Sequence, residues 1–103
     1  TKEVWRTLKP GGAYLFAVPT YKQNLVTERA ARFLPDGGIE HYREPEYHGN
    51  PINPQGSLVT FRYGYDFPEL IRSWTPLDTR VYRFHDHRHG LIGEFTEIYL
   101  CTK

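Results

Sequence analysis

The sequence predicts an α/β fold in which helices alternate with strands. Residues 13–18 (AYLFAV) are apolar without alternation, which is typical of a strand in a parallel sheet that helices cover on both faces. Near the end of the chain, 79–84 (TRVYRF) and 94–101 (EFTEIYLC) are rich in β-forming residues and are separated by a His, Asp and Gly turn. We therefore expect one parallel strand, a terminal antiparallel hairpin, and helices.

The composition limits the class of protein. The 103 residues fit one small domain, and 39% hydrophobic residues can form a modest core. A net charge of +1 argues against dedicated nucleic-acid binding, which needs a basic surplus. No segment is apolar for long enough to span a membrane, and no signal-peptide pattern opens the chain. The single cysteine, Cys101, fits a reducing compartment, so we expect a soluble cytoplasmic protein.

The first expected element is a helix that ends before Pro10. Val4, Trp5 and Leu8 recur at the spacing that places apolar side chains on one helical face. The segment 9–12 (KPGG) stops the helix, because proline cannot continue the hydrogen-bond ladder and glycine can adopt a positive φ. The helix has no visible start and the sequence contains no Met. We therefore expect a processed product or a piece of a larger protein.

The middle of the chain gives weaker patterns. Residues 20–34 predict a helix with Leu25, Val26, Ala30 and Phe33 on one face, and 35–38 (PDGG) end it as a turn. Residues 39–56 hold no period of either kind, and their mixture of prolines and aromatic residues predicts an ordered loop.

Two further elements precede the terminal hairpin. Residues 57–63 predict a short strand. Asp66 is an expected N-cap two residues before Pro68, and a short helix follows that ends before Pro76. The apolar stripe of this helix consists of Phe67, Leu70, Ile71 and Trp74.

The segment RTLKPGGAYLFAVP at 6–19 resembles the class I S-adenosylmethionine-dependent methyltransferases. In that family a helix closes with a Leu-Lys-Pro-Gly-Gly turn, here residues 8–12, before the fifth strand of a seven-stranded sheet. The family ends in a reversed hairpin whose last strand inserts between the fifth and sixth strands, and residues 79–101 are similar. Residues 40–66 resemble an insertion in some methyltransferase-like proteins. The resemblance implies that residues 1–103 are the C-terminal part of a single Rossmann-like methyltransferase domain, with an insertion at 39–56.

The resemblance also implies S-adenosylmethionine as the cofactor of the parent protein. The glycine-rich loop and the acidic ribose-binding residue of the family have no counterpart in this chain. Gly37 and Gly38 follow a predicted helix and are interpreted as a turn. Most of the cofactor pocket is therefore absent, its residues here are unknown, and we expect no cofactor binding by this chain alone.

Ligands of open α/β sheets collect beyond the carboxyl ends of the strands, and the loop at 41–50 can fold across that edge. Methyl transfer needs a positioned acceptor and sometimes a general base. His41 and His48 are the candidate catalytic bases, because imidazole titrates near neutral pH. The candidate contacts to the unidentified methyl acceptor are Pro19, Tyr21, Tyr42, Tyr47 and Asn50. Such side chains can instead fix the loop by bonding backbone groups.

Two other function classes stay open. The first is a non-enzymatic module in which the loop at 40–56 binds a small ligand or a protein. The second is a metal protein, because His85, His87 and His89 would share one face of an extended strand. A solvated hairpin tip and the charge of Arg88 argue against that metal site, so we predict none.

An unpaired strand edge at 13–18 would recruit another chain. We therefore expect the isolated chain to dimerise or aggregate through this edge.

Overall fold

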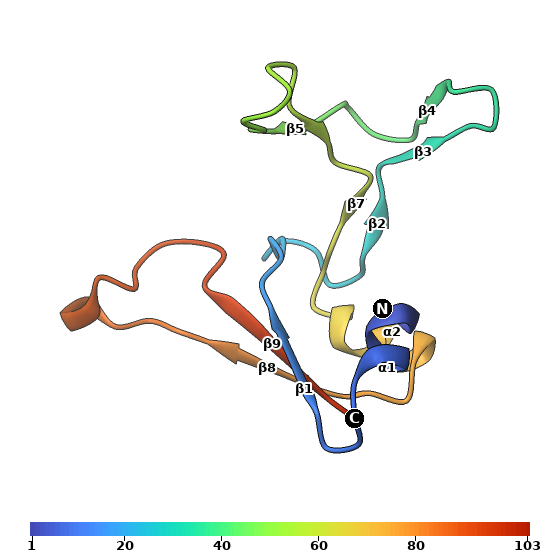
Figure 1. The fold of residues 1–103 in the computed structure, drawn as a ribbon. Helices are drawn as coiled ribbons and strands as arrows, with labels where there is room; N and C mark the ends of the chain where they lie inside the picture. The colour runs from blue at the N-terminus through green and yellow to red at the C-terminus, as the bar shows by residue number, and fades with distance from the viewer.

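The computed structural model describes all 103 residues and divides into a sheet with two helices and an extension of short ladders (Figure 1). The first part contains α1 (Lys2–Thr7), β1 (Ala13–Phe16), α2 (Phe67–Trp74), β8 (Asp78–Arg83), a 3-10 turn (His87–His89) and β9 (Glu97–Thr102). The extension contains β2 (Glu28–Arg29), β3 (Ala31–Phe33), β4 (Ile39–His41), β5 (Tyr47–His48), β6 (Ser57–Leu58) and β7 (Phe61–Arg62). Its ladders are β2-β7, β3-β4 and β5-β6.

The main sheet has the strand order β1-β9-β8. The last strand of the chain, β9, is antiparallel to both neighbours, so that β1 and β8 run in the same direction on either side of it. Cys101 lies opposite Tyr14 on one side and opposite Thr79 on the other. The terminal hairpin predicted from the sequence is confirmed.

The predicted Rossmann-like sheet with a parallel strand is wrong. Every ladder is antiparallel, and the one parallel pairing is an isolated bridge between Thr20 and Tyr63. Strand β1 lies at a sheet edge, and only one of its faces packs on the core. Its other face carries Leu15, which is 64% exposed. An apolar run without alternation predicts two nonpolar faces, but it cannot show that this chain covers both of them.

The core lies between α2 and the inner face of the sheet. Phe67 and Ile71 from α2 meet Tyr99 and Cys101 from β9, and Leu77 completes the cluster. The Tyr99 ring stacks on Phe16 at 5.4 Å and meets Phe67 edge-on at 5.1 Å between ring centroids. The predicted helix at 67–74 is therefore confirmed. Of its apolar stripe, Phe67 and Ile71 are buried and Leu70 packs against the core, whereas Trp74 is 41% exposed.

The LKPGG turn is fastened to the last residue of the chain. Lys103 Nζ donates hydrogen bonds to the carbonyl oxygens of Trp5 (2.7 Å) and Leu8 (2.8 Å), and it lies 4.3 Å from the Trp5 ring centroid. A cation is favourable at this end of a helix, where carbonyl groups have no partner within the helix. The backbones of Gly11 and Gly12 also pair with that of Lys103 at 2.7 and 2.9 Å.

The helix predicted for residues 20–34 is wrong, because this segment holds strands β2 and β3. The PDGG segment does not stop a helix: it turns the chain from β3 to β4, with Leu34 N–H donating to Gly38 O at 2.8 Å and Gly37 at φ 86°. Periodicity over this segment was weak, and its backbone finds ladder partners in β4 and β7. The strand predicted at 57–63 divides into β6 and β7, which pair with different strands.

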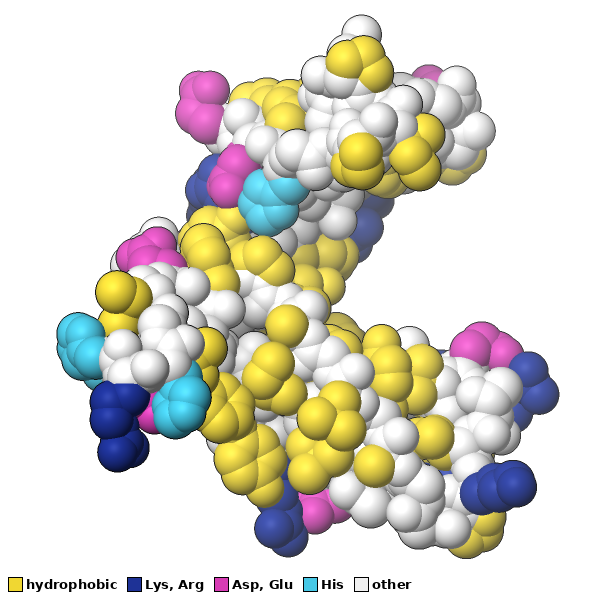
Figure 2. Space-filling view, turned by 60° about the vertical axis from the view of Figure 1, so that its left-hand side comes forward, with side chains coloured by type: hydrophobic (Ala, Val, Ile, Leu, Met, Phe, Trp, Pro, Cys, Tyr) yellow, Lys and Arg dark blue, Asp and Glu magenta, His cyan; other side chains and the backbone are white.

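The outer face of the main sheet carries several apolar side chains beside the exposed ion pair of Asp78 and Arg80. The register places Leu15 opposite Leu100, and Tyr82 opposite Ile98, on the face away from α2. Figure 2 shows hydrophobic side chains gathered over the lower half of the molecule, which contains this sheet. The free edge of β1 borders the same face, so backbone groups and apolar side chains are presented together.

We predict that the isolated chain associates through β1 and that Leu15→Lys prevents it, because a charge on an edge strand opposes pairing. Sedimentation equilibrium is expected to show the wild-type mass rising with concentration above 12.1 kDa. Ile52→Lys is the matched control, since Ile52 is 92% exposed but lies in the extension. A wild-type mass constant at 12.1 kDa, or equal loss in both variants, contradicts the prediction.

Candidate functional site

A polar cluster forms where the extension meets the chain that leaves β1. The Tyr21 hydroxyl donates a hydrogen bond to Glu46 Oε1 at 2.6 Å, and His48 Nε2 lies 3.4 Å from the same oxygen. Arg62 Nε donates to the other carboxylate oxygen, Oε2, at 3.2 Å. Glu46 is therefore the centre of the cluster and contacts three side chains from separate parts of the sequence.

Backbone pairing holds Tyr21 in place. Thr20 forms the bridge with Tyr63, and the Tyr21 N–H donates to Tyr63 O at 2.8 Å. The Thr20 hydroxyl is buried against the Tyr99 hydroxyl at 2.6 Å, which ties this segment to β9. The phenol that meets Glu46 is thus carried by a segment anchored to the main sheet.

The β5-β6 hairpin holds His48. At its tip the Asn50 side chain donates to Ser57 Oγ at 2.8 Å and accepts from the Ile52 N–H at 2.9 Å. Gly56 has φ 82°, and a Cβ there would lie 2.6 Å from His48 O, so the return strand needs glycine at this position. Asn50 therefore stabilises the loop through hydrogen bonds. This is the alternative to substrate contact that the sequence left open for it.

The electrostatics of the cluster are fixed by burial and by one hydrogen bond. Burial raises the pKa of the Tyr21 phenol to about 12, and the hydrogen bond to Glu46 adds to the rise. The Tyr21 hydrogen bond lowers the pKa of the Glu46 carboxyl, with His48 and Arg62 adding to the effect against burial. At neutral pH Tyr21 is accordingly a neutral donor and Glu46 is a carboxylate.

This arrangement suits proton transfer at His48. A carboxylate on one ring nitrogen orients an imidazole and leaves the other nitrogen free to accept a proton. The His48 side chain is half-exposed, so a bound molecule can reach it. Tyr21 and Arg62 hold Glu46 and act on the imidazole only through it.

The other predicted site residues lie outside this cluster. His41 ends β4 opposite Ala31 and is exposed on a different hairpin from His48 (Figure 1). The Tyr42 hydroxyl donates to Glu40 at 2.7 Å, and this bond raises the pKa of Tyr42. Tyr47 is exposed on β5, and Pro19 lies before Thr20 without a side-chain partner in the cluster. The structure thus brings together Tyr21 and His48 only.

Sequence reasoning missed Glu46 and Arg62. Glu46 could have been found, because residues two apart in an extended segment point to the same face and Glu46 precedes His48 by two. The sequence gives no such signal for Arg62. Its contact with Glu46 depends on where the pairing of β7 with β2 places it, and that pairing joins residues far apart in the sequence.

The histidine-rich segment at 85–89 does not form the extended strand on which the metal hypothesis depended. His87–His89 is a 3-10 turn at the tip of the β8-β9 hairpin. His89 Nδ1 lies 2.7 Å from Asp86 Oδ2, and the Arg88 N–H donates to Asp86 Oδ1 at 2.9 Å. Nowhere in the chain do three or more His, Cys, Asp or Glu side chains gather in a way that could hold a metal ion.

The residues of this chain do not fit S-adenosylmethionine. Gly37 and Gly38 belong to the β3-β4 turn, and a Cβ on Gly64 would lie 2.7 Å from Asn24 O, so Gly64 makes room for the chain's own backbone. The Asp66 carboxylate accepts hydrogen bonds from the backbone and the hydroxyl of Thr27 at Oδ1, at 2.8 and 2.7 Å, and so ties the start of α2 to the segment before β2.

Comparison with protein-family models, with curated proteins and with solved structures gives no match for this chain. The longer of its two helices has 8 residues, and neither is long and apolar enough to cross a membrane, which takes about 20.

We predict that Tyr21→Phe lowers the free energy of unfolding by about 1 kcal/mol at neutral pH, because it removes a hydrogen bond to a charged carboxylate. Since folding lowers the Glu46 pKa, this stabilisation is complete above the ordinary value of 4.5 and is lost as pH falls through the folded value. Since folding raises the Tyr21 pKa to about 12, it is also lost as pH rises from 10.0 through that value.

Urea unfolding of both proteins across this range measures the difference. Tyr47→Phe is the control, because the Tyr47 side chain is exposed, and it is expected to change the unfolding free energy little at any pH. If Tyr21→Phe lowers the free energy of unfolding equally at neutral and at acidic pH, the hydrogen bond from Tyr21 to the Glu46 carboxylate is not the source of the stabilisation, and the prediction is wrong.

Proposed function

We propose that this chain is the C-terminal, acceptor-binding part of an S-adenosylmethionine-dependent methyltransferase, with the cofactor held by residues outside 1–103. The observation that carries the proposal is the strand order β1-β9-β8: although no Rossmann-like sheet is present, the last strand of the chain lies between two others, as the resemblance expects of a last strand. The LKPGG turn supports it further, because it closes α1 and leads into β1 as in that family.

His48 is the base in this proposal. Tyr21 follows the carboxyl end of β1, and Glu46 and His48 are held beside it. His48 would accept the proton that the acceptor loses, and Glu46 would keep the imidazole oriented. The acceptor itself is unidentified. We also assign the protein to the cytoplasm, supported by the buried, unpaired thiol of Cys101.

A non-enzymatic binding module is the second candidate. It is favoured by the β5-β6 hairpin, whose tip is fixed by Asn50 yet exposes the Ile52 side chain almost fully. An apolar side chain on an ordered, protruding loop suits contact with a protein.

Calorimetry with S-adenosylmethionine tests the first proposal. The product of the whole open reading frame is expected to bind the cofactor, whereas residues 1–103 alone are expected to give no heat. Absence of binding by the whole product contradicts the proposal and favours the binding module.

Transfer of a radiolabelled methyl group by the whole product tests the role of His48. We predict that His48→Gln slows transfer by about 10²-fold or more, the usual contribution of a general base, and leaves cofactor affinity unchanged. His41→Gln is the control and is expected to transfer at the wild-type rate, because His41 is outside the cluster. Equal effects of the two substitutions contradict the assignment.

A further inference from the structure

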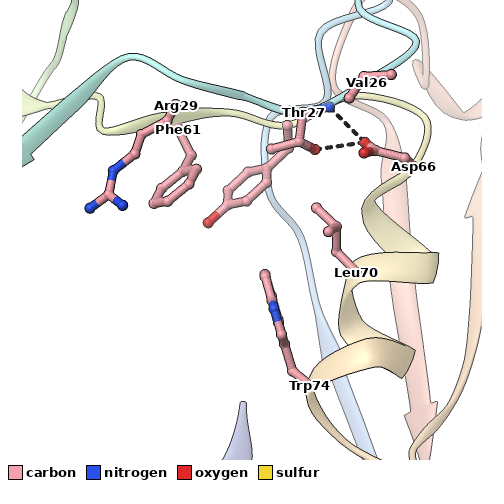
Figure 3. A pocket seen from close by; sticks show the side chains of 8 residues that line it. Val26, Thr27, Arg29, Phe61, Asp66, Leu70 and Trp74 are labelled. Atoms are coloured by element: carbon pink, nitrogen blue, oxygen red, sulfur yellow. Dashed lines mark hydrogen bonds between the residues drawn. The ribbon is translucent and has the colours of Figure 1, made fainter. Parts of the chain in front are cut away.

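We propose that the cavity between β2, β7 and α2 is a binding site for a small planar aromatic molecule that carries one negative charge. The cavity has a volume of about 370 Å³, within the range of small-molecule sites. The side chains that define it are Arg29, Phe61, Tyr63, Asp66, Leu70 and Trp74 (Figure 3). It lies apart from the Tyr21–Glu46–His48 cluster and does not depend on methyl transfer.

Aromatic rings form the wall of the cavity. The rings of Phe61 and Tyr63 are nearly parallel, with 8° between their planes and 6.0 Å between their centroids. Leu70 and Trp74 rise toward them from α2 (Figure 3). Phe61 and Trp74 are partly exposed, which leaves their rings free for a ligand. Flat, apolar walls of this kind favour a planar ring system through stacking and burial.

Arg29 supplies the positive charge. It is the one arginine of the chain that forms no ion pair with a carboxylate; the others are Arg6, Arg32, Arg43, Arg62, Arg72, Arg80, Arg83 and Arg88. Its guanidinium carbon lies 5.2 Å from the Phe61 ring centroid, and its Nε donates to Ala31 O at 3.4 Å. The terminal nitrogens keep their donors for a ligand, and a guanidinium binds carboxylate or sulfonate groups with two parallel bonds.

Asp66 limits the charge of the ligand. It lies on the other side of the aromatic rings from Arg29 (Figure 3). Its Oδ1 accepts from the backbone and side chain of Thr27 at 2.8 and 2.7 Å, so the carboxylate is fixed at the wall. A second negative charge at that end would be repelled. The ligand class is therefore a monoanion whose charged group lies at Arg29 and whose rings lie over Phe61 and Tyr63.

Fluorescence titration with two dyes tests the site. The probe is 8-anilinonaphthalene-1-sulfonate, and its neutral counterpart is N-phenyl-1-naphthylamine, which has the same rings without the sulfonate. We expect Arg29→Gln to raise the dissociation constant of the sulfonate by about tenfold or more, typical of a lost bond to a charged group, and to leave that of the neutral dye unchanged.

Three variants complete the experiment. Arg32→Gln is the matched control, because Arg32 pairs with Glu40 on the neighbouring hairpin, and it is expected to bind both dyes as wild type does. Arg29→Lys is expected to recover part of the sulfonate affinity. Trp74→Ala is expected to weaken both dyes. Equal sulfonate affinity for Arg29→Gln and wild type, or equal weakening of both dyes by Arg29→Gln, overturns the proposal.

Discussion

Pairing of β9 with both β1 and β8 is the interaction on which the rest of the structure depends. It joins the beginning, the last third and the end of the chain in one sheet. The same strand places Tyr99 in the core, where it stacks on Phe16 and meets Phe67. Lys103, directly after β9, closes the end of α1. Loss of this strand would leave β1 without a partner and expose the inner face of α2.

The two sites also follow from this arrangement. The bond between Tyr99 and Thr20 fixes the segment that presents Tyr21 to Glu46, so the polar cluster is linked to the core by one buried contact. A second link runs from Asp66, at the start of α2, to Thr27 at the entrance to β2. That link sets the distance between the helix and the extension, and with it the width of the aromatic cavity.

The sequence predicted elements whose patterns are local. The helix at 67–74 has a clear stripe, the KPGG stop is unambiguous, and the terminal strands are rich in β-forming residues. The extension could not be predicted, because its ladders are two or three residues long and depend on partners distant in the sequence. Likewise, the apolar run at 13–18 predicts a strand with two nonpolar faces, but it does not show which elements of the chain cover each face. For the same reason Tyr21 and His48 could each be proposed from the sequence. Their shared contact with Glu46 could not, because it depends on how strands distant in the sequence pair.

Residue-resolved amide hydrogen exchange tests the central role of β9 most directly. We predict that the amides of Ile98, Leu100 and Cys101, together with the amides of β1 and β8 that face β9, are the slowest to exchange and do so as one cooperative unit. The short ladders of the extension are expected to exchange earlier. Fast exchange in β9, or slower exchange in the extension than in the main sheet, would contradict it.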